Sequence, residues 1–225
     1  MSEIGVVYQM VRVPTGTEYV RLGAVSTSSA ARQRLLAAVI EHIQRAGISD
    51  LSLRELAAAI GTSHRMLIYH FGSREGLLLD VVRAVEAAQR AFLVDLLADP
   101  RRSRVEVMRT MWQRLVDPSL WPNERLFFEL YAQALQGRPG TVEMLDGIVD
   151  AWVEPMVQVA LQPGEDADVL RADTRLGVAV VRGLLLDLLA TRDRAAVDAA
   201  FERYLALQVA VNYPAEAAAL AASAP

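Results

Sequence analysis

Apolar side chains recur every three or four positions along most of the chain, which is the period of an amphipathic α-helix. The first stripe stops before Gly47, a residue type that commonly ends helices, and consists of Leu35, Leu36, Val39, Ile40 and Ile43. It predicts a helix over about 29–46. A shorter stripe starts after Ser52, which stands three residues before Glu55 as in a capping box, and ends at Gly61. It predicts a second helix over about 53–60.

Two further helices follow without a long connection. A third helix is expected to start at Thr62 or Ser63, whose hydroxyls can accept hydrogen bonds from free backbone N–H groups, and to run to about Tyr69. Ser73 is placed to cap a fourth helix, and the apolar stripe of that helix continues to Asp99. The fourth helix is long enough to join the first three to the rest of the chain.

The remaining chain keeps the helical period. Breaks are expected near Pro118, Pro122 and residues 137–140, and again at 163–164 and 191–193. They separate about five helical stretches, and the last two span about 168–190 and 194–212. No segment has the alternation of a strand, so the predicted fold class is all-α.

The composition is that of a folded chain with short flexible ends. A length of 225 residues and a hydrophobic content of 53% are sufficient for a buried core. The apolar residues before position 28 are scattered and form no helical stripe. We therefore divide the chain into a flexible N-terminal arm (1–27), a three-helix head (28–75), a helical body (76–215) and an Ala-rich flexible tail (216–225).

The chain contains neither cysteine nor lysine. Their absence excludes disulfides, thiolate metal sites, thiol catalysis and lysine Schiff bases. We find no cationic start followed by an apolar run and no uncharged stretch of about 20 residues that would span a bilayer. We expect no membrane segment, no export signal, and a cytoplasmic location.

The charge is distributed unevenly. The net charge is −4, which on its own argues against general nucleic-acid binding. Residues 1–80, however, carry eight arginines and seven acidic residues, whereas the rest of the chain carries 15 arginines and 20 acidic residues. The front of the chain is therefore slightly cationic and the back acidic.

Residues 51–78 carry the most informative motif, LSLRELAAAIGTSHRMLIYHFGSREGLL. This stretch resembles the DNA-binding head of the TetR family of transcriptional repressors, in which a short helix, a Gly-containing turn and a recognition helix precede an aromatic step and a capped helix. The matching positions are Gly61, Ser63, Leu67, His70, Phe71, Ser73, Arg74, Glu75 and Leu77. The resemblance implies a helix-turn-helix that binds double-stranded operator DNA.

The helical period of 3.6 residues predicts which face of the third helix contacts DNA. If Leu67 is the buried anchor, Arg65 and Tyr69 lie on the opposite face. Arg65 can offer a bidentate fork to guanine, and Met66 and Ile68 can contact thymine methyl groups. The family commonly has a tyrosine in place of Ile68, so the phosphate contact of that residue is lost or moved to Tyr69. The complete set of candidate DNA contacts is Arg54, Thr62, Ser63, His64, Arg65, Met66, Tyr69 and His70, and Arg32 or Arg34 can add phosphate contacts.

The body has no recognisable catalytic apparatus. The three histidines, His42, His64 and His70, all lie in the head, so the body has no histidine for a metal site or for acid–base catalysis. We find no nucleophile elbow, phosphate loop or dinucleotide fingerprint. We expect a protein that is not an enzyme and that needs neither a metal nor a cofactor.

Aromatic and thioether side chains recur on successive helices of the body. Such residues usually form only a core. The family resemblance implies the alternative, a cavity for a hydrophobic effector lined by Met108, Trp112, Phe128, Tyr131 and Trp152. Arg109, Gln113 and Gln133 are candidates for orienting that ligand.

The last two helices carry apolar stripes that either cover the core of a monomer or form an interface. The stripes contain Val178, Val181, Leu185 and Leu188 in one helix and Val197, Phe201, Tyr204 and Leu205 in the other. In the TetR family the corresponding pair packs against its twin, and a two-fold dimer is needed to bind two half-sites. We expect a homodimer.

Together these features predict a sequence-specific transcriptional regulator, a repressor that a hydrophobic small molecule releases from its operator. One alternative is a ligand-binding protein that keeps the helix-turn-helix head without operator binding, which the acidic net charge and Ile68 favour. A second is a helical enzyme for a bound hydrophobic substrate, which the lack of histidine and cysteine in the body disfavours.

Overall fold

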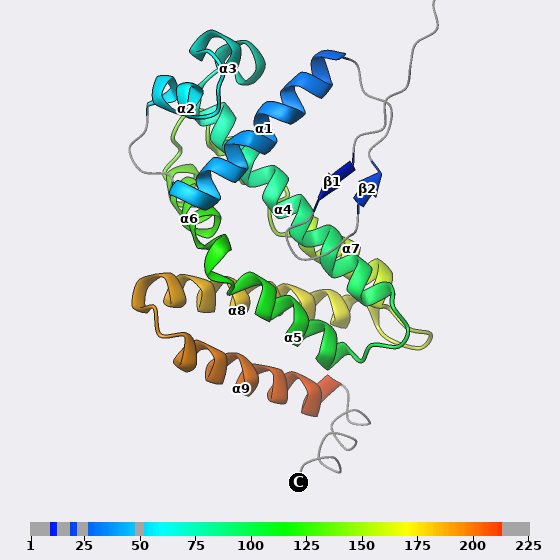
Figure 1. Cartoon of the computed structure of the whole chain (residues 1–225). Coiled ribbons are helices and arrows are strands. Elements are labelled where there is room, and N and C mark those ends of the chain that lie inside the picture. The colour runs from blue at the N-terminus through cyan, green and yellow to red at the C-terminus, as the bar shows by residue number, and fades with distance from the viewer. Residues whose placement is uncertain (1–9, 13–18, 22–26, 48–51, 213–225) are drawn as a thin grey trace, which may run out of the picture.

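The computed structural model describes residues 10–12, 19–21, 27–47 and 52–212, which are almost entirely helical (Figure 1). The first four helices are α1 (Thr27–Ala46), α2 (Leu53–Ala59), α3 (His64–Phe71) and α4 (Arg74–Ala98). All four lie close to the bounds that the apolar pattern predicts, and the all-α class is confirmed.

Serine side chains start three of these helices. Ser52 forms both halves of a capping box with Glu55. The Ser63 hydroxyl accepts a hydrogen bond from Met66 N at 3.2 Å, and the Ser73 hydroxyl accepts one from Gly76 N at 2.9 Å. The short turns between the helices are made by Gly61 (φ 70°) and Gly72 (φ 77°), in a backbone region that glycine adopts without steric cost.

Five helices form the body, as predicted: α5 (Arg104–Leu115), α6 (Trp121–Leu135), α7 (Asp150–Ala160), α8 (Ala167–Thr191) and α9 (Arg194–Asn212). Short 3-10 turns lie before α6 and after it, η1 (Pro118–Leu120) and η2 (Val142–Met144). Pro122 lies in the first turn of α6 and not in a break, because the N–H that proline lacks has no helical partner there.

A pair of strands precedes the helices, which the apolar pattern does not predict. Strand β1 (Met10–Arg12) pairs antiparallel with β2 (Tyr19–Arg21), with Met10 opposite Arg21. Three residues are too few to establish an alternating pattern, although valine and tyrosine favour strands. Most of the arm predicted over 1–27 and the whole tail predicted over 216–225 lie outside the described residues.

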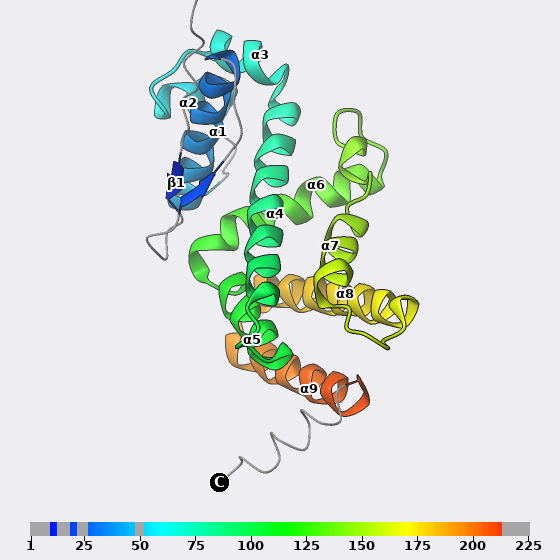
Figure 2. The same ribbon diagram turned by 90° about the vertical axis from the view of Figure 1, so that its right-hand side faces the viewer.

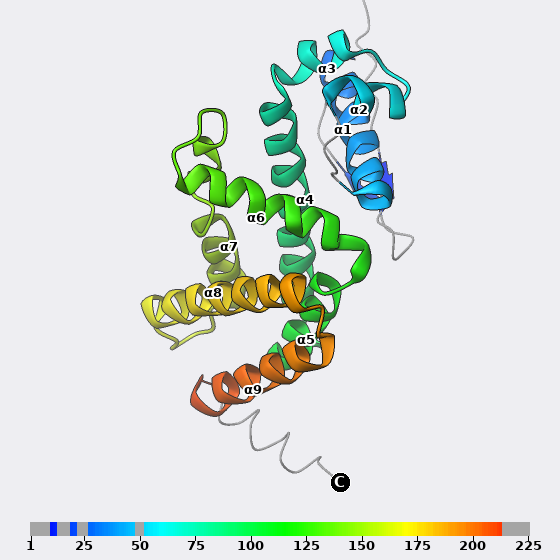
Figure 3. The same cartoon turned by 90° about the vertical axis from the view of Figure 1, so that its left-hand side faces the viewer.

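Helix α4 runs from the head to the body. In Figure 2, α1, α2 and α3 lie at one end of the molecule, and α8 and α9 lie at the other. Figure 3 shows α6 crossing α4 between the two ends. The head therefore contacts the body through α4 and α6.

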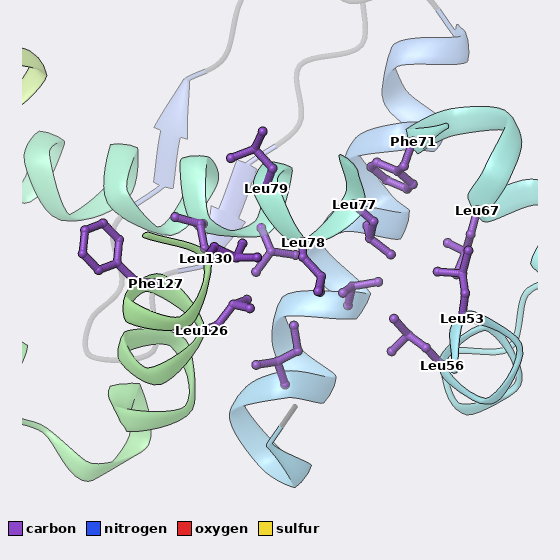
Figure 4. Close-up of a cluster of buried hydrophobic side chains, with 14 of the residues drawn as sticks. Leu53, Leu56, Leu67, Phe71, Leu77, Leu78, Leu79, Leu126, Phe127 and Leu130 are labelled. Carbon is purple, nitrogen blue, oxygen red and sulfur yellow. The ribbon is translucent and has the colours of Figure 1, made fainter. Parts of the chain in front are cut away.

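One hydrophobic cluster joins the head to α6. Leu67, Phe71 and Leu77 pack with the α2 leucines on one side, and Leu126 and Leu130 of α6 extend the same cluster (Figure 4). A second cluster fills the body between α4, α5, α7, α8 and α9, and the largest of its fully buried side chains are Trp112, Phe201 and Leu188. The head is therefore packed against the body through a continuous apolar contact.

Candidate functional site

Helix α3 has one buried and one exposed face. Leu67 and Phe71 are buried in the cluster shared with α1, α2 and α4. Arg65 is exposed, and Tyr69 leaves 73% of its surface accessible. Met66 and Ile68 flank them and are also exposed. A short helix at one end of the molecule thus presents a cation, a phenol and two apolar side chains to solvent, the mixture that major-groove contacts require.

Arg32 of α1 holds the end of α3 in place. Its Nε donates a hydrogen bond to the backbone oxygen of His70 at 3.2 Å, and its guanidinium forms an ion pair with Asp80 of α4. The same guanidinium lies 5.0 Å from the centre of the Phe71 ring. Arg32 therefore ties α1, α3 and α4 together, so that α3 is presented in one orientation.

The body encloses a cavity of about 190 Å³ between helices α4 to α9. Its wall is largely apolar and includes the indoles of Trp112 and Trp152 and the rings of Phe127 and Phe128. Met108, Met111 and Met156 add flexible thioethers. A cavity with this wall suits a small, predominantly apolar molecule.

Charged side chains occupy one part of the cavity wall. Trp152 Nε1 donates a hydrogen bond of 2.7 Å to Glu86 of α4, and the guanidinium of Arg182 lies 3.9 Å from the same carboxylate. Burial raises the pKa of Glu86, while the Trp152 hydrogen bond and the charges of Arg182 and Arg90 oppose the rise. Glu86 is therefore a partly compensated buried acid.

The carboxyl group of Glu124, on α6, has fewer hydrogen bonds and positive charges to offset its burial than Glu86 has. Glu124 is 6% exposed and lines the same cavity. Burial, and next the nearby charge of Glu86, raise the pKa of Glu124 to about 8, although Arg182 acts in the opposite direction. Glu124 is therefore mostly protonated near neutral pH when the cavity is empty.

The outer faces of α8 and α9 carry exposed apolar residues. On α8 the exposed stripe is Ala172, Leu176, Ala179, Gly183, Leu186 and Ala190, and on α9 it includes Ala196, Ala200, Leu207, Ala210 and Val211. Leu186 is 53% exposed and Leu207 is 50% exposed. Exposed apolar side chains at this helical spacing, interrupted on α9 by Arg203, form a candidate binding surface, which we call the apolar patch.

Residues 35–81 match the family model for bacterial regulatory proteins of the tetR family. The matched segment covers α2, the turn, α3 and the start of α4, together with most of α1. This segment of the chain is therefore a TetR-type DNA-binding head. A comparison with curated proteins finds no significant match.

Solved structures of TetR-type regulators share the fold over most of the chain. A TetR regulator from Legionella pneumophila is 19% identical, with a TM-score of 0.60 over 82% of this chain and 97% of that one. A putative regulator from Saccharomonospora viridis, in complex with choline, is 23% identical, with a TM-score of 0.56 over 82% of this chain and 97% of that one. The Thermus thermophilus repressor FadR, in complex with lauroyl-CoA, is 22% identical, with a TM-score of 0.52 over 77% of this chain and 92% of that one. At these identities the matches establish the fold.

The predicted DNA contacts of this TetR-type head differ in how far the structure exposes them to solvent. The residues Arg54, Ser63, His64, Arg65, Met66 and Tyr69 are exposed. Thr62 is partly buried. His70 is also partly buried, and its Nε2 is inaccessible and has no hydrogen-bond partner among the described residues. Arg32 is occupied by contacts within the protein, whereas Arg34 is exposed.

Four of the five predicted effector contacts meet in the cavity, namely Met108, Trp112, Phe128 and Trp152. The fifth, Tyr131, stacks on Phe127 with ring centres 5.6 Å apart and is not part of the wall. The three candidate polar contacts also lie elsewhere. Arg109 pairs with Glu202 at 2.7 Å, Gln113 accepts a hydrogen bond from Arg194, and Gln133 donates one to Glu129.

The polar residues that do line the cavity were not among the candidates predicted from the sequence. Glu86, Glu124 and Arg182 each interrupt an apolar helical face, for example Arg182 between Val178 and Leu185. A charge within an apolar stripe is the signal that would have found them, because a charged side chain is seldom buried without a partner or a role.

The prediction that the apolar stripes of the last two helices form the dimer interface is wrong, because the stripes face the core of the same chain. Leu185 is 5% exposed and Phe201 is 1% exposed, because both pack into the body core beside α5. The opposite faces of α8 and α9 are the exposed ones. None of the described helices is long and apolar enough to cross a membrane, and the described residues include no cluster of three or more metal-binding side chains.

Proposed function

We propose that the protein is a homodimeric transcriptional regulator that binds operator DNA with α3 and is released by a small, largely apolar molecule in the body cavity. The observation that carries the proposal is the outward face of α3, where Arg65 and Tyr69 are held exposed by a buried anchor, Leu67. This is the element that TetR-type heads insert into the major groove. Such a regulator acts in the cytoplasm.

The cavity supports the regulatory part of the proposal. Helices from the whole body line it, and two proteins of the same fold carry choline and lauroyl-CoA in their structures. A molecule bound among α4 to α9 contacts α4 and α6, which also pack against the head. Binding there can therefore shift the position of the head, and repression is the activity most directly lost by such a shift.

The apolar patch on α8 and α9 supports the dimer. Its small and aliphatic residues allow close packing of helices, and a second copy of the chain presents the same patch in a two-fold arrangement. A dimer places two α3 helices on one side of DNA, where half-sites one helical turn apart are separated by about 34–36 Å.

The experiment that tests the proposal is selection of bound duplexes from a random pool. We expect enrichment of sites with two inverted half-sites, and we expect retention that weakens as salt is raised. The matched variant is Arg65→Ala, which should enrich sites with a relaxed preference at one base of each half-site while the protein keeps its helical content. Failure of the unaltered protein to enrich any sequence would contradict operator binding.

The second candidate function is a ligand-binding protein whose head does not bind DNA. The net charge of −4 and the presence of Ile68 on the DNA-facing side favour it. In that case ligands bind to the cavity but the protein elutes from a DNA column at low salt, and no half-site emerges from the selection.

A further inference from the structure

The strongest unexplained feature of the cavity is the carboxyl group of Glu124. The side chain is more than nine-tenths buried, it lines the cavity, and no described residue forms a hydrogen bond with it. The adjacent Asn123 is 3% exposed, and neither its Nδ2 nor its Oδ1 has a partner among the described residues, but Asn123 lies outside the wall of this cavity. Unpaired buried polar groups are rare because each costs free energy, and they commonly mark a ligand.

The nearest cation does not neutralise Glu124. Arg182 donates a hydrogen bond to the backbone oxygen of Ile148 at 3.0 Å and lies 3.9 Å from Glu86. Its guanidinium also lies over the ring of Phe127, 5.1 Å from the centre. These contacts hold Arg182, and Arg90 of α4 lies 3.8 Å from Glu86 as a second cation for that carboxylate. Glu124 has no such second cation, and Arg182 is the one arginine that lowers its pKa.

The remaining wall carries one arginine and one acidic residue. The arginine, Arg104, forms a hydrogen bond with Glu165 at 2.9 Å and another with the backbone oxygen of Ala160 at 2.9 Å. Asp173 adds a third acidic group to the wall. The rings of Trp152 and Phe127 each already lie near a guanidinium, that of Arg90 at 5.8 Å and that of Arg182 at 5.1 Å, so this part of the wall has surroundings that accept a cation.

We propose that the effector carries a protonated amine or another organic cation on an apolar body, and that Glu124 binds the cationic group together with Glu86. The apolar part of the molecule lies against the tryptophan, phenylalanine and methionine side chains. This inference rests on the proposed function, because it takes the cavity as the effector site. Since Glu124 is largely protonated in the empty cavity, binding a cation displaces its proton to solvent.

The test compares three probes of equal chain length, n-octylamine, n-octanol and n-octanoate, by quenching of tryptophan fluorescence in the full-length dimer. We expect n-octylamine to bind most tightly. Glu124→Gln should weaken n-octylamine binding by roughly 10- to 100-fold and leave n-octanol binding nearly unchanged. The matched control is Glu129→Gln on the same helix, whose side chain is exposed and outside the cavity.

Calorimetry in two buffers of different ionisation enthalpy adds an independent readout. At pH 7 we expect release of close to one proton on binding of n-octylamine and none on binding of n-octanol. Glu124→Gln should abolish the release. The comparison of the probes on the unaltered protein does not depend on the folding of any variant.

The outcomes separate this inference from the proposed function. Equal affinities for n-octylamine and n-octanol, tighter binding of n-octanoate, or no binding of n-octylamine would overturn cation recognition. If n-octanol alone binds and releases the operator, the regulatory function stands and the cationic effector does not. If n-octylamine binds through Glu124 but operator affinity stays constant, the cation site stands and the regulatory role of the cavity is lost.

Discussion

Arg65 and Tyr69 occupy the same exposed face of α3 but offer different chemistry to DNA. A guanidinium can form two hydrogen bonds with guanine, whereas a phenol suits a phosphate oxygen. Arg65→Ala should therefore cost about 1–3 kcal/mol of operator binding and relax the preference at one base in each half-site. Titration of cognate and scrambled duplexes measures both effects, and equal losses on the two duplexes would remove Arg65 from base recognition.

Tyr69→Phe serves as the comparison on the same helix. The substitution keeps the ring and removes only the hydroxyl, so it should weaken binding to all sequences alike if that hydroxyl contacts a phosphate. Phosphate contacts carry no direct sequence information. A change in sequence preference for Tyr69→Phe would assign the phenol to base contact instead.

Glu124 also makes folding stability depend on pH. Its pKa is about 8 in the folded protein and 4.5 in the absence of the fold, so the folded state binds the proton more tightly. The contribution of Glu124 to stability is greatest below pH 4.5 and is lost as pH rises from 4.5 to about 8. Glu86 of α4 shifts in the same direction, while Arg90 of α4 and Arg182 of α8 oppose the shift of Glu86.

Glu124→Gln should therefore stabilise the protein at pH 8 relative to the unaltered chain, by an amount on the order of a few kcal/mol. The difference between the two proteins should shrink towards pH 5. Urea unfolding at pH 5, 6.5 and 8 gives the free energies of unfolding, with Glu129→Gln as the control for an exposed position. A difference that does not change with pH would show that Glu124 is ionised in the folded protein.

At the scale of elements, α8 and α9 have apolar residues on both faces. The inner faces pack on the body through Leu185, Leu188 and Phe201, and the outer faces carry Leu186 and Leu207. Apolar period alone cannot distinguish the two faces, because both satisfy it. Contact with α5 and α7 decides which face is buried.

Neighbouring leucines of α8 give a matched pair of substitutions. Leu186→Glu places a charge in the outer patch and should split the dimer without loss of helix content, because a buried unpaired charge is costly at an interface. Leu185→Glu places the same charge in the core and should destabilise the fold itself. Sedimentation and circular dichroism distinguish the two results. A Leu186→Glu protein that sediments as a dimer would exclude this patch as the interface.

At the scale of the whole molecule, two helices connect the cavity to the head. Helix α4 begins at the Ser73 cap beside α3 and contributes Glu86, Leu93 and Leu97 to the wall. In α6, Phe127 lines the cavity and also belongs to the cluster that includes Leu67 and Phe71. A ligand that displaces Phe127 or α4 therefore acts on the packing of the head, and α6 provides a route in addition to α4.

Thermodynamic linkage makes this coupling measurable. A ligand that weakens operator binding by some factor must itself bind more weakly, by the same factor, to the protein–operator complex. A typical coupling of about 1–3 kcal/mol corresponds to roughly 5–150-fold in each direction. The measurement is a titration of n-octylamine, or of an effector found by screening, into free and operator-bound protein with tryptophan fluorescence as the signal. Identical affinities would mean that the cavity does not regulate the head.

The amino-acid sequence by itself determined the helices and the head. Apolar periods, serine caps and glycine turns are local signals, and they placed the bounds of α1 to α4, α8 and α9 closely. Between α4 and α8 they predicted only breaks, and α7 begins at Asp150, well after the break expected at 137–140. The motif residues of the head lie at fixed spacings within one continuous segment, from Leu53 to Leu77. The TetR-type head could therefore be inferred from the sequence. Four cavity-lining residues followed from the recurrence of aromatic and thioether side chains.

Only the tertiary structure decided the inward faces of α8 and α9 and the polar part of the cavity. Glu86, Glu124 and Arg182 come from three helices, and nothing local in the sequence predicts that they will meet in one cavity wall. The same is true of Arg32, which is available for phosphate in the sequence but is committed to Asp80 and His70 in the fold. These outcomes depend on contacts between distant segments, and burial and charge pairing are properties of those contacts and not of any one helix.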